Sequence, residues 1–196
     1  NSGTPTGTKN NTFLYTKTNN YSLKQSSENA ESENRVFPIL ESQDLTVGNK
    51  TERRTVFLKY DDYGNKVHAR LGDERDGVDV FYLWSYDGQY PIIEITGCND
   101  YEVFKEAVES AFGMNIEQIP YLSPISPEAL QRVREHPLLK KAHVTTYQYD
   151  PLIGITELTD PSGQTTFFEY DKANRLSAVY RLEDGEKVIL NNYQYK

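Results

Sequence analysis

The densest cluster of potentially reactive side chains is acidic and lies within residues 73–79. Asp73, Glu74, Asp76 and Asp79 stand at relative positions 1, 2, 4 and 7 of this segment. An EF-hand calcium loop needs ligands at positions 1, 3, 5, 7, 9 and 12, so the spacing does not match. We therefore predict a solvated hairpin tip in this segment rather than a calcium site.

The other reactive side chains are few and scattered. His68, His136 and His143 show no metal-binding spacing, so we expect surface or partly buried histidines. Cys98 is the single cysteine, which excludes an intramolecular disulfide and a multi-cysteine metal site. It precedes a predicted helix, but no histidine or asparagine partner follows at a recognised spacing, so we expect a buried, unreactive thiol. The sequence contains neither a Gly-x-Ser-x-Gly elbow nor a glycine-rich phosphate loop. It predicts no catalytic residue, metal or cofactor.

Aromatic side chains dominate the composition. The 196 residues include 15 Tyr, 8 Phe and 1 Trp, and such rings favour strands and buried positions. Six of them form period-2 pairs, so that each pair is expected to face one side of a strand. They are Tyr147 and Tyr149, Phe168 and Tyr170, and Tyr193 and Tyr195. Two interpretations are open: the six rings are core beneath helices, or they form a partly exposed ligand-binding platform that stacks on sugar rings or peptides.

The charge balance excludes other classes of partner. There are 21 Lys and Arg against 29 Asp and Glu, a net charge of −8, and no basic stripe, so we expect no nucleic-acid ligand. The mean hydropathy is −0.71, and no run of about 18 apolar residues exists. We therefore expect no membrane span. The first residue is Asn and no signal peptide is visible, so we interpret the chain as a processed or excised piece.

A Tyr-Asp unit followed by turn residues recurs along the chain. An Asp at the first turn position can bond the backbone two residues on, and Gly64 and Asn174 stand where such a turn needs a left-handed residue. Asp150 and Asp171 are 21 residues apart, and a fixed period of this kind indicates a repeat array. The units are Tyr60-Asp61, Tyr86-Asp87, Tyr149-Asp150 and Tyr170-Asp171.

The turn signals divide the chain into segments. We expect residues 1–34 to be a polar N-terminal arm, with a possible hairpin turn at Asn19-Asn20. Residues 35–96 form a first hairpin section that begins with an edge strand, because Pro38 cannot donate to a ladder. Residues 144–196 form a second section, an antiparallel meander whose hairpins also turn at Asp160-Pro161-Ser162-Gly163 and Asp184-Gly185.

Residues 97–143 break this rhythm with two helical patterns. The first runs from a cap at Asn99 to Gly113, and its apolar residues fall on one face. The second begins at Ser126-Pro127 and closes at Pro137. We therefore predict an α+β fold: a twisted antiparallel sheet of consecutive hairpins, with two helices from the insert packed on one face.

The Tyr-Asp units, with Asp-Pro-x-Gly and Asp-Gly turns between them, resemble the RHS/YD repeats of large secreted or cell-surface bacterial proteins. The closest blocks are residues 83–92 and 143–154, with a helical insert between them. The resemblance implies an extracellular or cell-surface location and strands wound into a curved sheet, which forms a shell in long members. Some members carry a toxin after a self-cleaving core motif, and that motif does not occur in this sequence.

The resemblance favours a non-enzymatic structural segment that continues a larger β-sheet shell or scaffold. The alternatives are a carbohydrate-binding module that uses exposed tyrosines, and a glycan-processing enzyme with two carboxylates that the sequence does not identify. Partners would be neighbouring repeats or another chain at the strand edges, with carbohydrate as the alternative ligand. We further expect the last strand, near residues 188–195, to be covered by the N-terminal arm or by another molecule.

Overall fold

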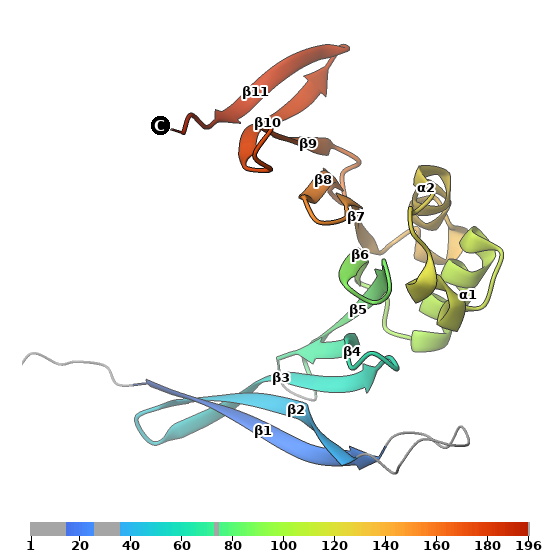
Figure 1. Cartoon of the computed structure of the whole chain (residues 1–196). Coiled ribbons are helices and arrows are strands. Elements are labelled where there is room, and N and C mark those ends of the chain that lie inside the picture. The colour runs from blue at the N-terminus through green and yellow to red at the C-terminus, as the bar shows by residue number, and fades with distance from the viewer. Residues whose placement is uncertain (1–14, 26–35, 73–74, 196) are drawn as a thin grey trace, which may run out of the picture.

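The chain forms one open antiparallel sheet of 11 strands that carries a helical insert (Figure 1). The computed structural model describes residues 15–25, 36–72 and 75–195. Neighbours in the sheet are neighbours in the chain, and the insert lies in the connection from β6 to β7. The strands are β1 (Tyr15–Gln25), β2 (Val36–Val47), β3 (Lys50–Tyr60), β4 (Lys66–Leu71), β5 (Val78–Ser85), β6 (Tyr90–Thr96), β7 (His143–Asp150), β8 (Gly154–Thr159), β9 (Thr165–Tyr170), β10 (Leu176–Glu183) and β11 (Glu186–Asn192).

The insert confirms the predicted α+β class. It contains α1 (Tyr101–Phe112), the 3₁₀ helix η1 (Ile116–Tyr121), α2 (Pro127–Arg134) and the 3₁₀ helix η2 (Pro137–Leu139). Asp100, and not the predicted Asn99, caps α1 by accepting from the Glu102 amide, and Gly113 ends it at φ +69°. Ser126 caps α2 as predicted, through the amide of Ala129.

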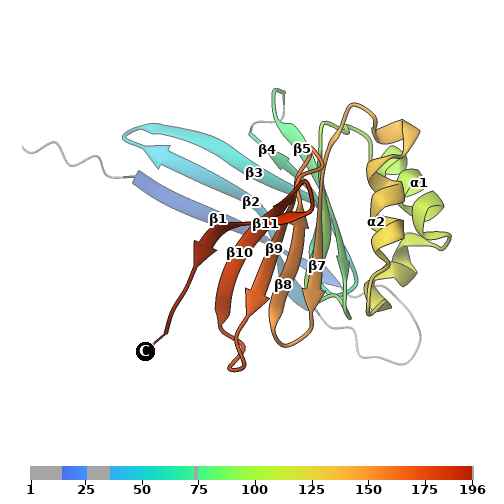
Figure 2. The same cartoon turned by 90° about the horizontal axis from the view of Figure 1, so that it is seen from above.

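The helices cover only the middle of the sheet. Figures 1 and 2 show all of the insert on one side of the strands, and Figure 1 shows both ends of the sheet curving away from that side. The contacts agree, because α2 packs on β7 and η1 packs on β5. The sheet therefore has a covered centre and two uncovered wings.

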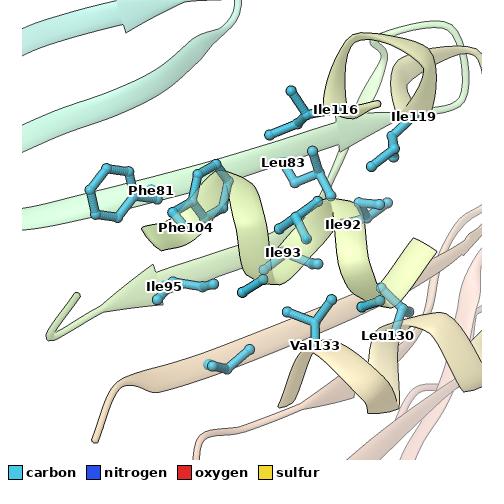
Figure 3. Close-up of a cluster of buried hydrophobic side chains, with 14 of the residues drawn as sticks. Phe81, Leu83, Ile92, Ile93, Ile95, Phe104, Ile116, Ile119, Leu130 and Val133 are labelled. Carbon is cyan, nitrogen blue, oxygen red and sulfur yellow. The ribbon is translucent and has the colours of Figure 1, made fainter. Parts of the chain in front are cut away.

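The main hydrophobic core lies between the insert and the central strands (Figure 3). Phe81 of β5 stacks on Phe104 of α1 with ring centroids 5.1 Å apart. Both rings are completely buried, as are Ile93 and Ile95 of β6. Burial of each such side chain stabilises the fold by roughly 1.5–3 kcal/mol, so this layer is the main source of apolar stabilisation.

The second section is the predicted meander. Strands β7 to β11 pair in consecutive hairpins, and the last one turns at Asp184 and Gly185, whose φ angles are +53° and +83°. This is the type of two-residue turn that Asp-Gly favours. β11 ends at Asn192, a few residues earlier than predicted.

Of two predictions for the first strands, one is wrong. Asn19 and Asn20 do not form a turn, because β1 runs through them with a bulge after Asn20. The Asn20 amide instead donates to Ser42 and Asp44 of β2, which holds it within the sheet. Pro38 pairs with Leu23 of β1, but pairing of β2 with β3 begins only at Ser42. In the described part of the chain, the other side of the segment around Pro38 is therefore an open edge, as predicted.

The acidic segment 73–79 is also not simply a hairpin tip. Asp73 and Glu74 lie outside the described residues. Asp79 is a buried residue of β5 whose carboxylate accepts from Arg70 at 2.9 and 3.0 Å and lies 2.9 Å from His68 Nε2. Burial would raise its pKa, but these hydrogen bonds outweigh burial and hold the pKa below its usual value. Asp79 is therefore a structural ion-pair partner.

Candidate functional site

Three Tyr-Asp or Asp-Pro turns share one hydrogen-bond pattern. The first residues of these turns are Asp61, Asp160 and Asp171, and each carboxylate accepts from the amides two and four residues ahead, at 2.7–3.0 Å. In each turn the residue in the fourth position has a positive φ, as predicted for Gly64 (+82°) and Asn174 (+57°). The turn at Asp160 therefore belongs to the same class, although it lacks a preceding tyrosine.

Several of the repeated tyrosines hydrogen-bond to the strand before their own. The Tyr60 hydroxyl donates to the Leu40 carbonyl of β2, and the Tyr170 hydroxyl donates to the Ile155 carbonyl of β8 at 2.8 Å. Tyr195 repeats this contact with the Leu176 carbonyl of β10, at 2.8 Å. Each of these tyrosines therefore hydrogen-bonds to the strand that precedes its own segment. After Tyr60 and Tyr170, the carboxylate of Asp61 or Asp171 then shapes the turn that leads to the next strand. This explains why Tyr and Asp stand together.

The other two units have different geometry. Tyr86 and Asp87 both have φ +55°, and the Tyr86 amide donates to Leu122 of the insert at 3.0 Å. At Asp150 the turn places Leu152 in the left-handed position, with φ +70°, and the Ile153 amide donates to the Asp150 carbonyl. The common sequence motif thus contains turns of more than one type.

The six aromatic residues predicted as a ligand-binding set do not share one environment. Tyr149 stacks on Tyr90, with ring centroids 4.6 Å apart, and packs edge-on against Tyr86 beside the core. Burial raises the pKa of Tyr149 and, to a smaller extent, that of Tyr147. Both side chains are half-buried, and Tyr149 is a structural contact of the core.

The remaining four rings lie in the uncovered C-terminal wing. Phe168 and Tyr170 are half-buried, and the Tyr170 hydroxyl would lie 2.6 Å from a Cβ added at Gly154. Tyr193 and Tyr195 follow β11, are 41% and 47% exposed, and Arg175 lies 4.3 Å from the centre of the Tyr195 ring. No helix of the insert covers these four residues, so the interpretation as core beneath helices is wrong for them.

The last strand carries a run of exposed apolar side chains. Every residue of β11 is exposed, and Val188, Ile189 and Leu190 form a consecutive apolar run. Among the described residues β11 has β10 as its single partner. The N-terminal strand does not cover it, because β1 lies at the opposite end of the sheet. This part of the prediction for the last strand is wrong.

The two edges of the sheet differ in chemistry. β1 also has a single partner in the described part of the chain, and its sequence is mostly polar. Its exposed apolar side chains, Tyr15, Tyr21 and Leu23, are scattered and accompanied by Lys17, whereas those of β11 are consecutive. Lysine and polar residues on an edge strand oppose pairing with further strands. β11 combines free backbone groups with exposed apolar side chains, so it is the edge better suited to another strand.

The remaining reactive side chains of the described residues lie apart from one another. No group of three His, Cys, Asp or Glu side chains among them is placed to hold a metal ion. Cys98 is buried, and its thiol lies 3.4 Å from the Asp100 carbonyl. His68 is partly buried, and His143 is exposed, as expected.

Comparisons with known proteins leave the family open. No protein-family model matches the chain, and a search of curated proteins finds no match. The structure itself contains no helix, within its described residues, that is long and apolar enough to cross a bilayer.

Proposed function

We propose that this chain is a structural segment of a secreted or cell-surface protein of the RHS/YD-repeat type, whose β-sheet continues beyond β11. The observation that carries the proposal is the open sheet with strands in chain order and an exposed apolar strand at its C-terminal end. Such a sheet grows by the addition of hairpins, and each addition buries the edge that the previous one exposed. The repeated turn supports the proposal because the same unit can be added again.

Strand addition at β11 is the step that can be tested. Among the described residues no strand pairs with the outer side of β11, so in a solution of this 196-residue polypeptide the β11 edge should pair with another copy at high concentration. Sedimentation velocity at increasing concentration should show this association. Ile189→Lys should suppress it, because Ile189 is 48% exposed and lysine opposes edge pairing.

A matched variant on the other edge provides the control. Leu23 of β1 is 75% exposed, and Leu23→Lys should leave the association unchanged. A chain that remains monomeric at all concentrations, or equal effects of the two variants, would contradict a role for β11 in extending the sheet.

A further inference from the structure

A pocket lies where the insert meets the turn between β3 and β4. Its volume is about 240 Å³, and the sheet and the insert both contribute to its wall. Pockets that combine aromatic walls with a few charged groups are the usual places for small ligands. The lining includes Lys59 from β3, Asp61, Asp62 and Tyr63 from the turn that follows it, Trp84 from β5, and Tyr101, Glu117 and Tyr121 from the insert.

Two tyrosines form an exposed ring pair in this pocket. The rings of Tyr63 and Tyr121 have centroids 5.8 Å apart, and the side chains are 44% and 62% exposed. Tyr63 is fixed from behind, because its ring packs so closely on Gly88 that an added Cβ would lie 2.6 Å from Tyr63 Cγ. The Gly88 amide donates to Pro120, next to Tyr121, at 3.2 Å. The pair is therefore positioned before any ligand arrives.

The pocket already holds one ammonium group of the protein itself. Lys59 Nζ lies 3.8 Å from the centre of the Tyr101 ring. Ammonium groups at this distance are attracted by the negative face of the ring. Among the described contacts, no cation lies over Tyr63 or Tyr121. The pocket thus has one occupied aromatic face and a second, open pair.

The charges also favour a positive ligand. Asp61, Asp62 and Glu117 line the pocket, and Lys59 is the lysine among the lining residues. Lys105 lies 3.7 Å from Glu117 but is shared with Glu109 at 3.8 Å. The whole chain carries −8, so its field attracts cations and repels phosphates.

We propose that this pocket binds an alkylammonium group, held over the Tyr63–Tyr121 pair and beside the carboxylate of Asp62. Two sources have this chemistry: a free small ammonium ion and the lysine side chain of a partner protein. The site goes beyond the structural role proposed above and does not depend on it, because no residue of β11 contributes to the pocket.

Titration of the full chain tests the site. Choline and capped lysine are the two cationic probes, methyl glucoside is the neutral one, and calorimetry and the fluorescence of Trp84, the single tryptophan, report binding. We expect choline to bind and methyl glucoside not to bind. Equal binding of capped lysine would identify the lysine side chain as a ligand, and its failure would identify the free ion. No binding of either cation, or equal binding of the glucoside, would overturn the proposal.

Variants of the ring pair separate binding from folding. Tyr121→Leu should weaken choline binding about threefold, since the aromatic attraction is lost, while Tyr121→Phe should keep it. Both variants should retain the circular dichroism of the parent because the side chain is largely exposed. Unchanged binding by Tyr121→Leu would overturn the proposed position.

Lys59 distinguishes a cation site from a site for a neutral polar ligand. Lys59→Met removes the internal ammonium and uncovers Tyr101, so choline should bind about threefold more tightly. Asp62→Asn should weaken binding, whereas Glu186→Gln on β11 removes a charge far along the sheet and should have little effect. Weaker binding by Lys59→Met would mean that Lys59 donates to the ligand, and the cation proposal would be wrong.

Discussion

The centre of the sheet and its C-terminal wing are built from the same hairpins but differ in what covers them. Phe81, Ile93 and Ile95 are completely buried beneath the insert, whereas β8 and β9 contain no buried residue and β11 is wholly exposed. The wing is held by ladder hydrogen bonds, the Asp turns and cross-strand pairs such as Phe167 on Tyr180, 5.2 Å apart. The difference indicates that the insert stabilises the centre, and the exposed wing is consistent with the proposal that further strands are added to it.

Truncation of one aromatic ring in each region should give the largest difference in the free energy of unfolding between the two regions. Phe104→Ala removes a fully buried ring from the central core, and we expect a loss of about 3–5 kcal/mol in the free energy of unfolding. Phe168→Ala in the half-buried wing should cost about half of that. Urea denaturation measures both. Equal losses would mean that the wing is packed as tightly as the centre.

The turns provide a second test. Gly88 packs on Tyr63 and has φ +71°, so Gly88→Ala combines a clash with backbone strain and should cost about 2–3 kcal/mol. Gly64 has φ +82° but nothing within 4 Å of an added Cβ, so Gly64→Ala should cost only about 1 kcal/mol. Thermal unfolding gives the ranking, and the reverse order would refute the docking of the Gly88 turn on Tyr63.

Leu152 offers a smaller effect in the opposite direction. It has φ +70° at the turn between β7 and β8 and is 92% exposed, so removal of its side chain loses little buried apolar area. Leu152→Gly should stabilise the chain by about 0.5–1 kcal/mol, because glycine adopts this conformation without strain. A lower melting temperature would contradict the backbone strain that we assign to Leu152.

Acid should loosen the wing through its turn carboxylates. Hydrogen bonds hold the pKa values of Asp160 and Asp171 below normal, with Ser162 the main donor to Asp160 and Arg175 to Asp171. A lowered folded-state pKa stabilises the protein above the unfolded value of about 3.9, and this contribution is lost as the pH falls through the folded value. Amide exchange from pH 6 to pH 3 should show that the turns at Asp160 and Asp171 open. Asp171→Asn should reduce the pH dependence of its own turn, and an unchanged profile would contradict this origin.

Much of the fold could be predicted because its signals are local. Asp-x-x-Gly and Asp-Gly turns, the Ser126 cap and the Gly113 stop depend on residues within a few positions of each other, and all of them are observed. The predicted turn at Asn19-Asn20 is wrong because asparagine side chains can also hydrogen-bond across strands. The bond from Asn20 to Asp44 depends on a residue 24 positions away, which local turn signals do not reveal.

The candidate sites depend on contacts that the sequence does not reveal. The pocket requires Tyr63 of the turn between β3 and β4 to contact Tyr121 of the insert, and no periodicity in the sequence links these positions. Likewise, Asp79 joins a row of surface acids in the sequence but is buried against Arg70 and His68. The sequence also does not predict the exposure of Val188, Ile189 and Leu190, because an apolar strand pattern normally indicates burial.

The central claim is that β11 is an edge prepared for another strand, and residue-level amide hydrogen exchange tests it most directly. The informative amides are those of residues 186–192 that do not bond to β10. They should exchange rapidly in dilute protein and become protected as concentration rises, while amides of β1 stay unchanged. Rapid exchange along this outer row at every concentration would mean that β11 takes no further strand, and would contradict the account.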